Sequence, residues 1–237
     1  MKLLAVDTSA KVTSVAVVDE NGILAEFSSD TKLTHSQSLM PMVDAMLTCA
    51  KISLDDIDGF ACAVGPGSFT GLRIGIGAIK GLAYGKNKPC VGISTLGGLA
   101  YNLKGFDGII CATMDARCNQ VYTSIYESSN DDMTCLYDDR AITMDELLEI
   151  LKTFEKNIIF VGDGANLCYN RLEQKLDNIF LSSNLVKYQR ASSIGFLALE
   201  ELNSGQAVQA DDLMPIYLRL PQAQRELIKK QEGEKNE

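Results

Sequence analysis

The sequence predicts an α/β protein made of two similar halves, each a mixed sheet flanked by helices. Two observations predict this fold. An apolar strand that ends in an aspartate occurs twice, at residues 3–7 and 109–115, and the same order of strands and helices follows each copy. A composition of 46% hydrophobic and 22% charged residues over 237 positions is typical of a globular protein with a sizeable core.

The first half is expected to begin with a three-stranded meander. Asn21-Gly22 marks the tight turn into the third strand. A helix with apolar residues at helical spacing comes next, and Pro41 lies within it. The expected elements are strands at 3–6, 14–18 and 23–28, a helix at 36–50, a strand at 58–64, a helix at 69–84, a strand at 91–93 and a helix ending near 103.

The second half repeats this layout. Asp115 corresponds to Asp7, and the turn Gly162-Asp163-Gly164 corresponds to Gly65-Pro66-Gly67. Thr143 with Glu146 forms the signature of a capping box at a helix start. The expected elements are strands at 109–114, 121–126 and 133–137, a helix ending near 156, a strand at 157–161 and helices at 165–176 and 192–203.

The central motif is the run GPGSFTGLR at residues 65–73, between a buried strand and a helix that Ser68 or Thr70 caps. Glycine-rich turns in this position often bind phosphate. The P-loop pattern requires Lys and then Ser or Thr after its last glycine. Here Leu72-Arg73 follows Gly71, so the run is not a P-loop and is only a weak signal for nucleotide.

The helix after this run contains five glycines, Gly71, Gly75, Gly77, Gly81 and Gly85. Each interior glycine costs roughly 1 kcal/mol relative to alanine. Glycines four apart lie on one helix face and permit close approach of another element. That element is either the chain's own sheet or a helix of another chain, and the spacing alone favours the sheet.

Charge and residue counts exclude several classes of function. The net charge of −9 predicts weak binding of the isolated chain to nucleic acid. Seven cysteines without a C-x-x-C pair, together with a single histidine, His35, do not make a zinc site of the usual types. His35 is expected to be a surface or capping residue. The odd cysteine count and the absence of a signal peptide predict a reducing, cytoplasmic location, and no membrane span is expected.

Several segments together resemble one protein family. They are VDTS at 6–9, the glycine run at 65–73, KGLA at 80–83, STL at 94–96, MDAR at 114–117 with VY at 121–122, and PIYLR at 215–219. The set is similar to the bacterial TsaB (YeaZ) family, from residue 1 to about residue 221. The glycine run is shared with the catalytic paralogue TsaD, whereas the MDAR segment and the short length favour TsaB.

This resemblance implies the duplicated fold of the actin, Hsp70 and sugar-kinase superfamily, which is ribonuclease H-like. It also implies an accessory, non-catalytic role in making N6-threonylcarbamoyladenosine beside the anticodon of tRNAs that read codons starting with A. TsaD transfers the threonylcarbamoyl group, and the ATPase TsaE assists. The implied partners are a TsaD-like paralogue, a TsaE-like ATPase and, without them, a second copy of the chain, with tRNA reached only through the complex.

The resemblance places a partner interface on the first two helices and so favours the docking interpretation of the glycine face. Met-rich spacing in the first helix is by itself equally consistent with core packing. The implied interface residues are Leu39, Met40, Val43, Met46, Arg73, Gly77, Ala78, Lys80 and Gly81. Arg73 has an alternative role in a local salt bridge with Asp55 or Asp56.

No catalytic or metal-binding residue is expected. TsaD binds its metal with two histidines four apart, whereas here His35 is followed at that spacing by Leu39. No tightly bound cofactor is expected, and ATP or ADP at the interface with the partner stays open. The implied domains are 1–104 with the dimer helices, 105–220 with a last helix that returns to the first half, and a polar tail at 221–237.

The alternative function is a small-molecule kinase or ATPase of the same fold. Asp7, Thr8, Ser9 and Asp115 would then form a nucleotide site, which the TsaB resemblance makes weak or vestigial. The two aspartates could hold Mg²⁺. Asp163 counts against this function because a carboxylate without a metal repels phosphate. A peptidase is the third and least favoured alternative, because one histidine would have to serve any catalytic triad.

Overall fold

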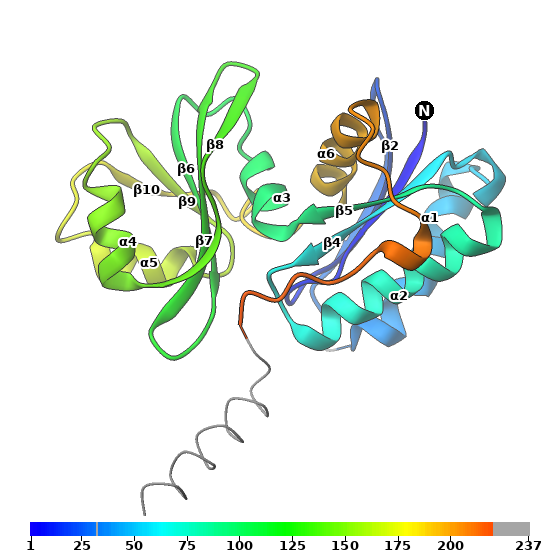
Figure 1. Cartoon of the computed structure of the whole chain (residues 1–237), viewed down its shortest axis with the longest axis horizontal. Helices are drawn as coiled ribbons and strands as arrows, with labels where there is room; N and C mark the ends of the chain where they lie inside the picture. The colour runs from blue at the N-terminus through cyan, green and yellow to red at the C-terminus, as the bar shows by residue number, and fades with distance from the viewer. Residues whose placement is uncertain (32, 220–237) are drawn as a thin grey trace, which may run out of the picture.

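Two five-stranded sheets with the same strand order form the framework of the protein (Figure 1). The computed structural model describes residues 1–31 and 33–219. The first sheet has the order β3-β2-β1-β4-β5 and the second has the order β8-β7-β6-β9-β10. The central strands β1 and β6 are each antiparallel to the next strand in sequence and parallel to the strand on the other side. The predicted duplicated fold is confirmed.

The elements of the first half follow the predicted order. They are β1 (Leu3–Asp7), β2 (Thr13–Asp19), β3 (Gly22–Ser29), α1 (His35–Ala50), the 3-10 turn η1 (Leu54–Asp56), β4 (Gly59–Gly65), α2 (Phe69–Lys86), β5 (Cys90–Ser94) and α3 (Thr95–Tyr101). Ser68 caps α2 by accepting a hydrogen bond from the backbone N–H of Gly71 at 3.3 Å, and Ser94 caps α3 in the same way.

The second half contains one strand that the sequence did not predict. Its elements are β6 (Gly108–Asp115), β7 (Gln120–Ser129), β8 (Asp132–Thr143), α4 (Met144–Leu151), β9 (Ile158–Val161), α5 (Ala165–Leu172), β10 (Ile179–Leu181), α6 (Ala191–Asn203) and the 3-10 turn η2 (Ala210–Asp212). β10 has only three residues and pairs with β9. It is the counterpart of β5, so the repeat itself could have indicated it.

Several expected elements differ in length: α5 ends at Leu172 and not near 176, and β7 continues to Ser129. β8 continues past Tyr137 to Thr143 through Asp138, Asp139 and Arg140, because an edge strand tolerates polar residues. α4 ends at Leu151, several residues earlier than expected, and Phe154 turns back to pack edge-on against the ring of Tyr137. The polar tail at 221–237 lies outside the described residues.

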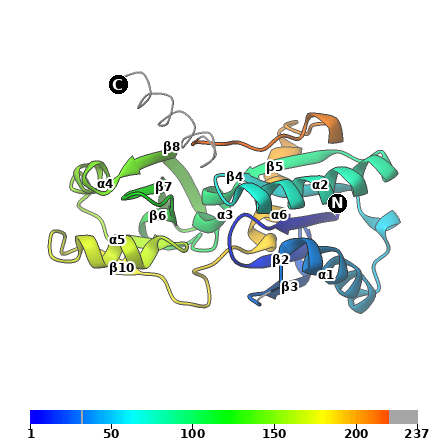
Figure 2. The same ribbon diagram turned by 90° about the horizontal axis from the view of Figure 1, so that it is seen from below.

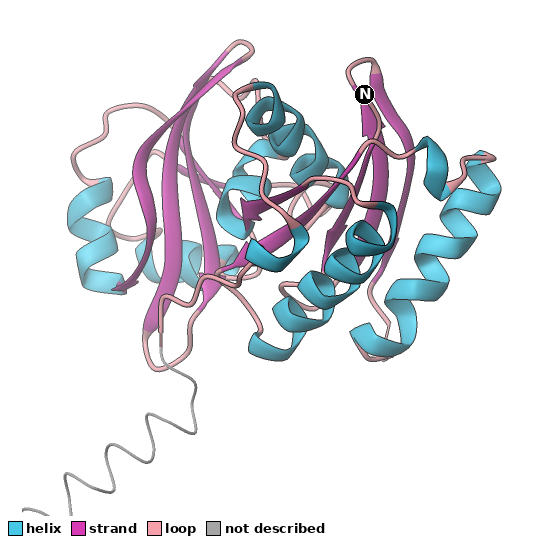
Figure 3. Ribbon diagram, turned by 45° about the vertical axis from the view of Figure 1, so that its right-hand side comes forward, coloured by secondary structure: helices cyan, strands magenta, loops and turns pink. Residues whose placement is uncertain are grey.

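Helices cover both faces of each sheet (Figures 2 and 3). α1 and α2 cover one face of the first sheet, and α6 covers the other, where it contacts β1 and β2. α4 and α5 cover one face of the second sheet, and α3 packs on the other, against β6 and β7. α3 and α6 also contact each other, so each half contributes a helix to the junction between the halves.

Candidate functional site

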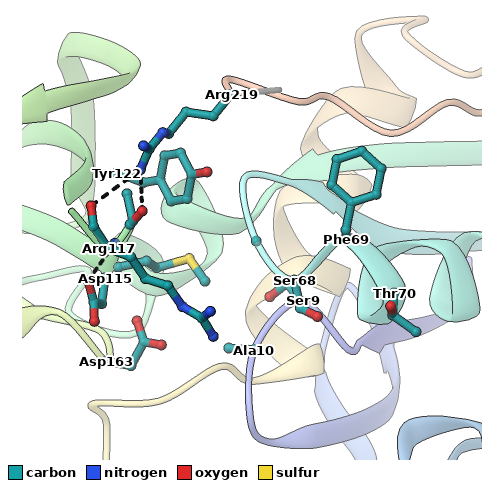
Figure 4. A pocket seen from close by; sticks show the side chains of 13 residues that line it. Ser9, Ala10, Ser68, Phe69, Thr70, Asp115, Arg117, Tyr122, Asp163 and Arg219 are labelled. Atoms are coloured by element: carbon teal, nitrogen blue, oxygen red, sulfur yellow. Dashed lines mark hydrogen bonds between the residues drawn. The ribbon is translucent and has the colours of Figure 1, made fainter. Parts of the chain in front are cut away.

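A cleft of about 520 Å³ lies between the two halves, where the loops after β1 and β6 face the start of α2 (Figure 4). Its lining comes from both halves and from the C-terminal segment. The lining residues are Ser9, Ala10, Gly67, Ser68, Phe69, Thr70, Met114, Asp115, Ala116, Arg117, Tyr122, Asp163 and Arg219. Of the residues predicted for a nucleotide site, Ser9 and Asp115 line the cleft.

Asp7 and Asp115 close equivalent turns at the ends of β1 and β6. The carboxylate of Asp7 accepts hydrogen bonds from the backbone N–H and the hydroxyl of Ser9, at 2.8 and 2.6 Å. The carboxylate of Asp115 accepts one from the backbone N–H of Arg117 at 2.7 Å. The predicted correspondence of the two aspartates therefore extends to their hydrogen bonds.

Asp7 and Thr8, which were named for a weak or vestigial nucleotide site, do not line the cleft. Asp7 is 2% exposed and does not line the cleft, and the hydroxyl of Thr8 donates to the carbonyl of Gly71 at 2.8 Å. Both side chains turn into the first half because α2 lies directly against the loop after β1. The pair of aspartates therefore does not present two carboxylates to one metal ion in this structure.

The cleft is lined by two acidic side chains, Asp115 and Asp163, and by two basic ones, Arg117 and Arg219. Partial removal of the Asp163 carboxylate from water raises its pKa to about 6, although a hydrogen bond from the backbone of Asp115 lowers it. Burial likewise raises the pKa of Asp7 to about 6, against the hydrogen bonds from Ser9. Near neutral pH both groups are largely ionised, so Asp163 adds negative charge where a nucleotide phosphate would approach.

The glycine run is used for packing within the chain. The N–H of Ser68 donates to the carbonyl of Ser9 at 2.7 Å, so this N–H is not free to bind a phosphate. A Cβ atom at Gly67 would lie 2.4 Å from the same carbonyl oxygen. The glycine at this position therefore allows the run to lie against the loop after β1.

The C-terminal segment crosses the cleft and was not given a role by sequence reasoning. Tyr217 stacks on Phe69 with ring centroids 3.8 Å apart, and its hydroxyl accepts a hydrogen bond from Arg73 at 3.0 Å. Arg219 then donates to the backbone carbonyls of Ala116, by a short contact, and of Arg117, at 3.3 Å (Figure 4). The resemblance motif at 215–219 marked this segment, but no local pattern shows contacts between residues so distant in sequence.

The glycines of α2 divide into two groups. A Cβ atom at Gly71 would lie 2.1 Å from the carbonyl oxygen of Thr8, and one at Gly75 would lie 2.5 Å from the hydroxyl of Thr8. A Cβ atom at Gly77, Gly81 or Gly85 would meet nothing within 4 Å. The first two glycines pack on the chain's own sheet, and the last three leave an open strip of backbone on the outer face.

Three of the residues implied for the partner interface are corrected by the structure. Leu39, Val43 and Met46 are at most 2% exposed, because this stripe of α1 packs on the first sheet and forms its core. The side chain of Leu39, four residues after His35, is therefore buried in the core and is not placed to bind a metal ion. Met40, at the edge of this stripe, is 43% exposed.

The implied interface residues of α2 have mixed surroundings. Ala78 is half-buried and packs against the core, and Lys80 is half-buried and donates to the carbonyl of Asp211 at 3.0 Å. Arg73 is exposed and contacts Tyr217, while Asp55 instead pairs with Lys86. The exposed members of the predicted interface are therefore Met40, Arg73, Gly77 and Gly81.

His35, the first residue of α1, is held by both ring nitrogens. Nε2 donates to the carbonyl of Ala10 at 2.7 Å, and Nδ1 lies 2.7 Å from the hydroxyl of Thr13.

Among the described residues no group of three histidine, cysteine, aspartate or glutamate side chains is placed to hold a metal ion. Within the same residues no helix is long and apolar enough to cross a membrane.

Comparison with known proteins assigns the family. A model of the family described as "TsaD: tRNA N6-adenosine threonylcarbamoyltransferase" matches residues 15–227. The "tRNA threonylcarbamoyladenosine biosynthesis protein TsaB" of Bacillus subtilis is 33% identical over 232 residues, which cover 98% of this chain and 100% of that protein. The chain belongs to the TsaB family.

Solved structures agree with the TsaB assignment. YeaZ from Pseudomonas aeruginosa superposes with a TM-score of 0.79 at 28% identity, over 92% of this chain and 99% of that chain. Component A of (R)-2-hydroxyglutaryl-CoA dehydratase from Acidaminococcus fermentans has a TM-score of 0.50 at 10% identity, over 86% of this chain and 99% of that chain. The second likeness shows the shared duplicated fold alone.

Proposed function

We propose that this TsaB-family chain is a non-catalytic subunit in the biosynthesis of tRNA threonylcarbamoyladenosine. It docks to a transferase of the TsaD family and activates it, with a TsaE-like ATPase as the third protein of a cytoplasmic complex. Without the transferase, the same surface joins two copies of the chain. The name of the Bacillus subtilis relative and the match to the TsaD model support this proposal.

The outer face of α2 is the observation that carries the proposal. Gly77, Gly81 and Gly85 expose bare backbone there at a cost in helix propensity of roughly 1 kcal/mol each. Within the described part of the chain, nothing occupies the space above them. A partner helix on this strip could approach to the lower end of the usual 8–10 Å axis distance or below it.

Large side chains are also exposed on α2 and on the neighbouring helix α1. Tyr84 of α2 is 76% exposed, and Met40 of α1 is 43% exposed. Tyrosine, methionine and arginine are enriched in protein interfaces, and Arg73 lies at the start of the same face. The surface that we assign to the partner is therefore Met40, Arg73, Gly77, Gly81 and Tyr84.

The cleft between the halves supports a non-catalytic role for the isolated chain. The backbone N–H of Ser68 donates a hydrogen bond to the carbonyl of Ser9. The buried carboxylate of Asp7 accepts hydrogen bonds from the backbone N–H and the hydroxyl of Ser9. Asp163 places a carboxylate in the cleft on the side of the second half, and a carboxylate repels phosphate. A nucleotide site, if the complex has one, is therefore expected at the interface with the partner.

The experiment is a substitution of Gly81 by leucine in the full chain. Leucine fits the open space in the monomer and improves helix propensity, so the monomer is expected to fold with an unchanged or higher Tm. The same side chain would occupy the space that the partner helix needs. Size-exclusion chromatography with the transferase is expected to show loss of the complex, and reconstituted tRNA modification is expected to fall with it.

The matched control is Asn170→Leu, which adds the same side chain to an exposed position of α5, far from α2 in the sequence and on the other half. This variant is expected to assemble normally. Normal assembly of the Gly81→Leu protein with the transferase would refute the interface. ATP turnover by the isolated wild-type chain would instead support a kinase or ATPase.

A further inference from the structure

The C-terminal segment, residues 208–219, is anchored on the first half by contacts along its length (Figure 1). Val208 pairs with the first residue of β5 through two backbone hydrogen bonds of 2.9 Å. Leu213 is 2% exposed and belongs to the core that α1 and α2 cover. The N–H of Ile216 donates to the carbonyl of Val64 in β4 at 2.8 Å. Several residues therefore share the attachment to the first half.

The attachment to the second half depends on one side chain. Within the described part of the chain, Arg219 is the residue of this segment that makes hydrogen bonds to the second half. Its guanidinium donates to the carbonyls of Ala116 and Arg117, in the turn between β6 and β7 (Figure 4). Both acceptors are uncharged, and a guanidinium binds such groups less strongly than a carboxylate. This end of the segment is therefore the easier one to release.

The turn that Arg219 contacts has an unfavourable backbone conformation. Arg117, Cys118 and Asn119 have φ angles of 60°, 54° and 57°, in the left-handed region. Residues other than glycine adopt this region rarely, and normally one at a time. The corresponding loop after β1, residues 8–12, contains no residue with a positive φ. A strained turn of this kind persists only where surrounding contacts enforce it.

The other hydrogen bonds found for this turn among the described residues come from the second half itself. The carboxylate of Asp115 accepts the N–H of Arg117, and the N–H of Gln120 donates to the carbonyl of Arg117 at 3.2 Å. Arg219 therefore supplies the hydrogen bonds that tie the turn to another part of the molecule. Ala116 and Arg117 line the cleft, so the conformation of the turn decides the shape of that wall.

We propose that the C-terminal segment is a latch with two states, which sets the conformation of the cleft. In the latched state Arg219 holds the turn in its left-handed conformation. In the released state the segment stays anchored as far as Tyr217, the turn relaxes, and the side chain of Arg117 leaves its place in the cleft. Tyr217 stacks on Phe69 and accepts a hydrogen bond from Arg73, so the latch also connects the cleft to the start of α2. This inference concerns the isolated chain and does not rest on the proposed function.

The test is NMR spectroscopy of the full, isotope-labelled chain with the substitution Arg219→Ala. A residue with a positive φ gives a strong cross-peak between its own amide and Hα protons, because the two lie close together in that conformation. The wild type is expected to show these cross-peaks at residues 117–119, and Arg219→Ala is expected to lose them. The signals of Ile216 and Val64 are expected to stay in place, because the anchor does not depend on Arg219.

The matched control is Arg171→Ala, which removes an exposed arginine of α5 on the second half and is expected to keep the left-handed turn. Left-handed cross-peaks that survive in Arg219→Ala would show that the turn is fixed by its own hydrogen bonds and would overturn the proposal. Equal displacement of the signals of Ile216 and of the turn would also overturn it, since the anchor would then not be independent.

Hydrogen exchange of the wild type decides the question if Arg219→Ala does not fold. Release of the latch opens the turn while the anchor stays closed, so the N–H of Gln120 is expected to exchange at least about tenfold faster than that of Ile216. Equal protection of the two N–H groups would mean that the turn and the anchor open together, which is contrary to a latch.

Discussion

Alanine at Gly71 and at Gly81 of the same helix is expected to change the stability of the protein in opposite directions. At Gly81 the new Cβ atom meets nothing within 4 Å, so the variant gains the helix propensity of alanine, about 0.5–1 kcal/mol. At Gly71 the Cβ atom would lie 2.1 Å from the backbone carbonyl oxygen of Thr8. Backbone must move to accept it, and such overpacking costs about 1–3 kcal/mol.

The assay is urea denaturation followed by circular dichroism, with thermal melts in parallel, on protein dilute enough to be monomeric, because a change at Gly81 would also weaken a dimer joined through this face. For a chain of this length, 1 kcal/mol corresponds to about 2–4 °C in Tm. Gly81→Ala is therefore expected to raise Tm by roughly 1–4 °C, and Gly71→Ala to lower it by roughly 2–12 °C. Gly77→Ala is the control for the open group and should behave like Gly81→Ala. A Gly71→Ala protein as stable as the wild type, or a destabilised Gly81→Ala protein, would refute the division of the glycines.

Three further outcomes are expected. Because burial raises the pKa of Asp7 from 3.8 to about 6, the native state binds this proton more tightly than the unfolded chain, so stability falls as the pH rises from about 3.8 to about 6 and the full cost remains above pH 6. Asp7→Asn keeps an oxygen acceptor for Ser9 and is expected to stabilise the protein by up to about 3 kcal/mol at pH 8 and by less at pH 5. An equal gain in the free energy of unfolding at both pH values, measured by urea titration, would contradict this. Tyr217→Ala removes the stack on Phe69 and the contacts with Arg73, and it is expected to lower the free energy of unfolding by about 1–2 kcal/mol. An unchanged urea midpoint would show that these contacts do not fix the C-terminal segment. The isolated chain, with its net charge of −9, is expected to bind tRNA weakly in filter assays, and tight, salt-resistant binding would be contrary.

The duplicated fold could be predicted because local signals repeat along the chain. Alternating apolar runs, turn residues and capping residues such as Ser68 and Thr143 mark each element, and the order of elements is the same in both halves. β10 escaped prediction because three residues of an edge strand do not show a period. Its pairing with β9 supplies the hydrogen bonds that decide its conformation.

The candidate site was predicted in part. Ser9 and Asp115 lie at the cleft, and Met40, Arg73, Gly77 and Gly81 are exposed as a docking surface requires. Asp7 and Thr8 were named for a weak or vestigial nucleotide site, but α2 packs on their loop and turns them inward. The sequence shows that aspartate ends a strand, but it does not show which neighbouring element encloses the side chain.

The sequence by itself determined that α2 is a glycine-rich helix and that α1 has one apolar stripe. Helical periodicity is a local property, so both features can be read from residue spacing. The tertiary structure alone decided that Leu39, Val43 and Met46 face the first sheet, and that Gly71 lies against the loop after β1 whereas Gly77 faces open space. The physical reason is that spacing fixes which residues share a face, whereas the packing of distant elements fixes which face is buried.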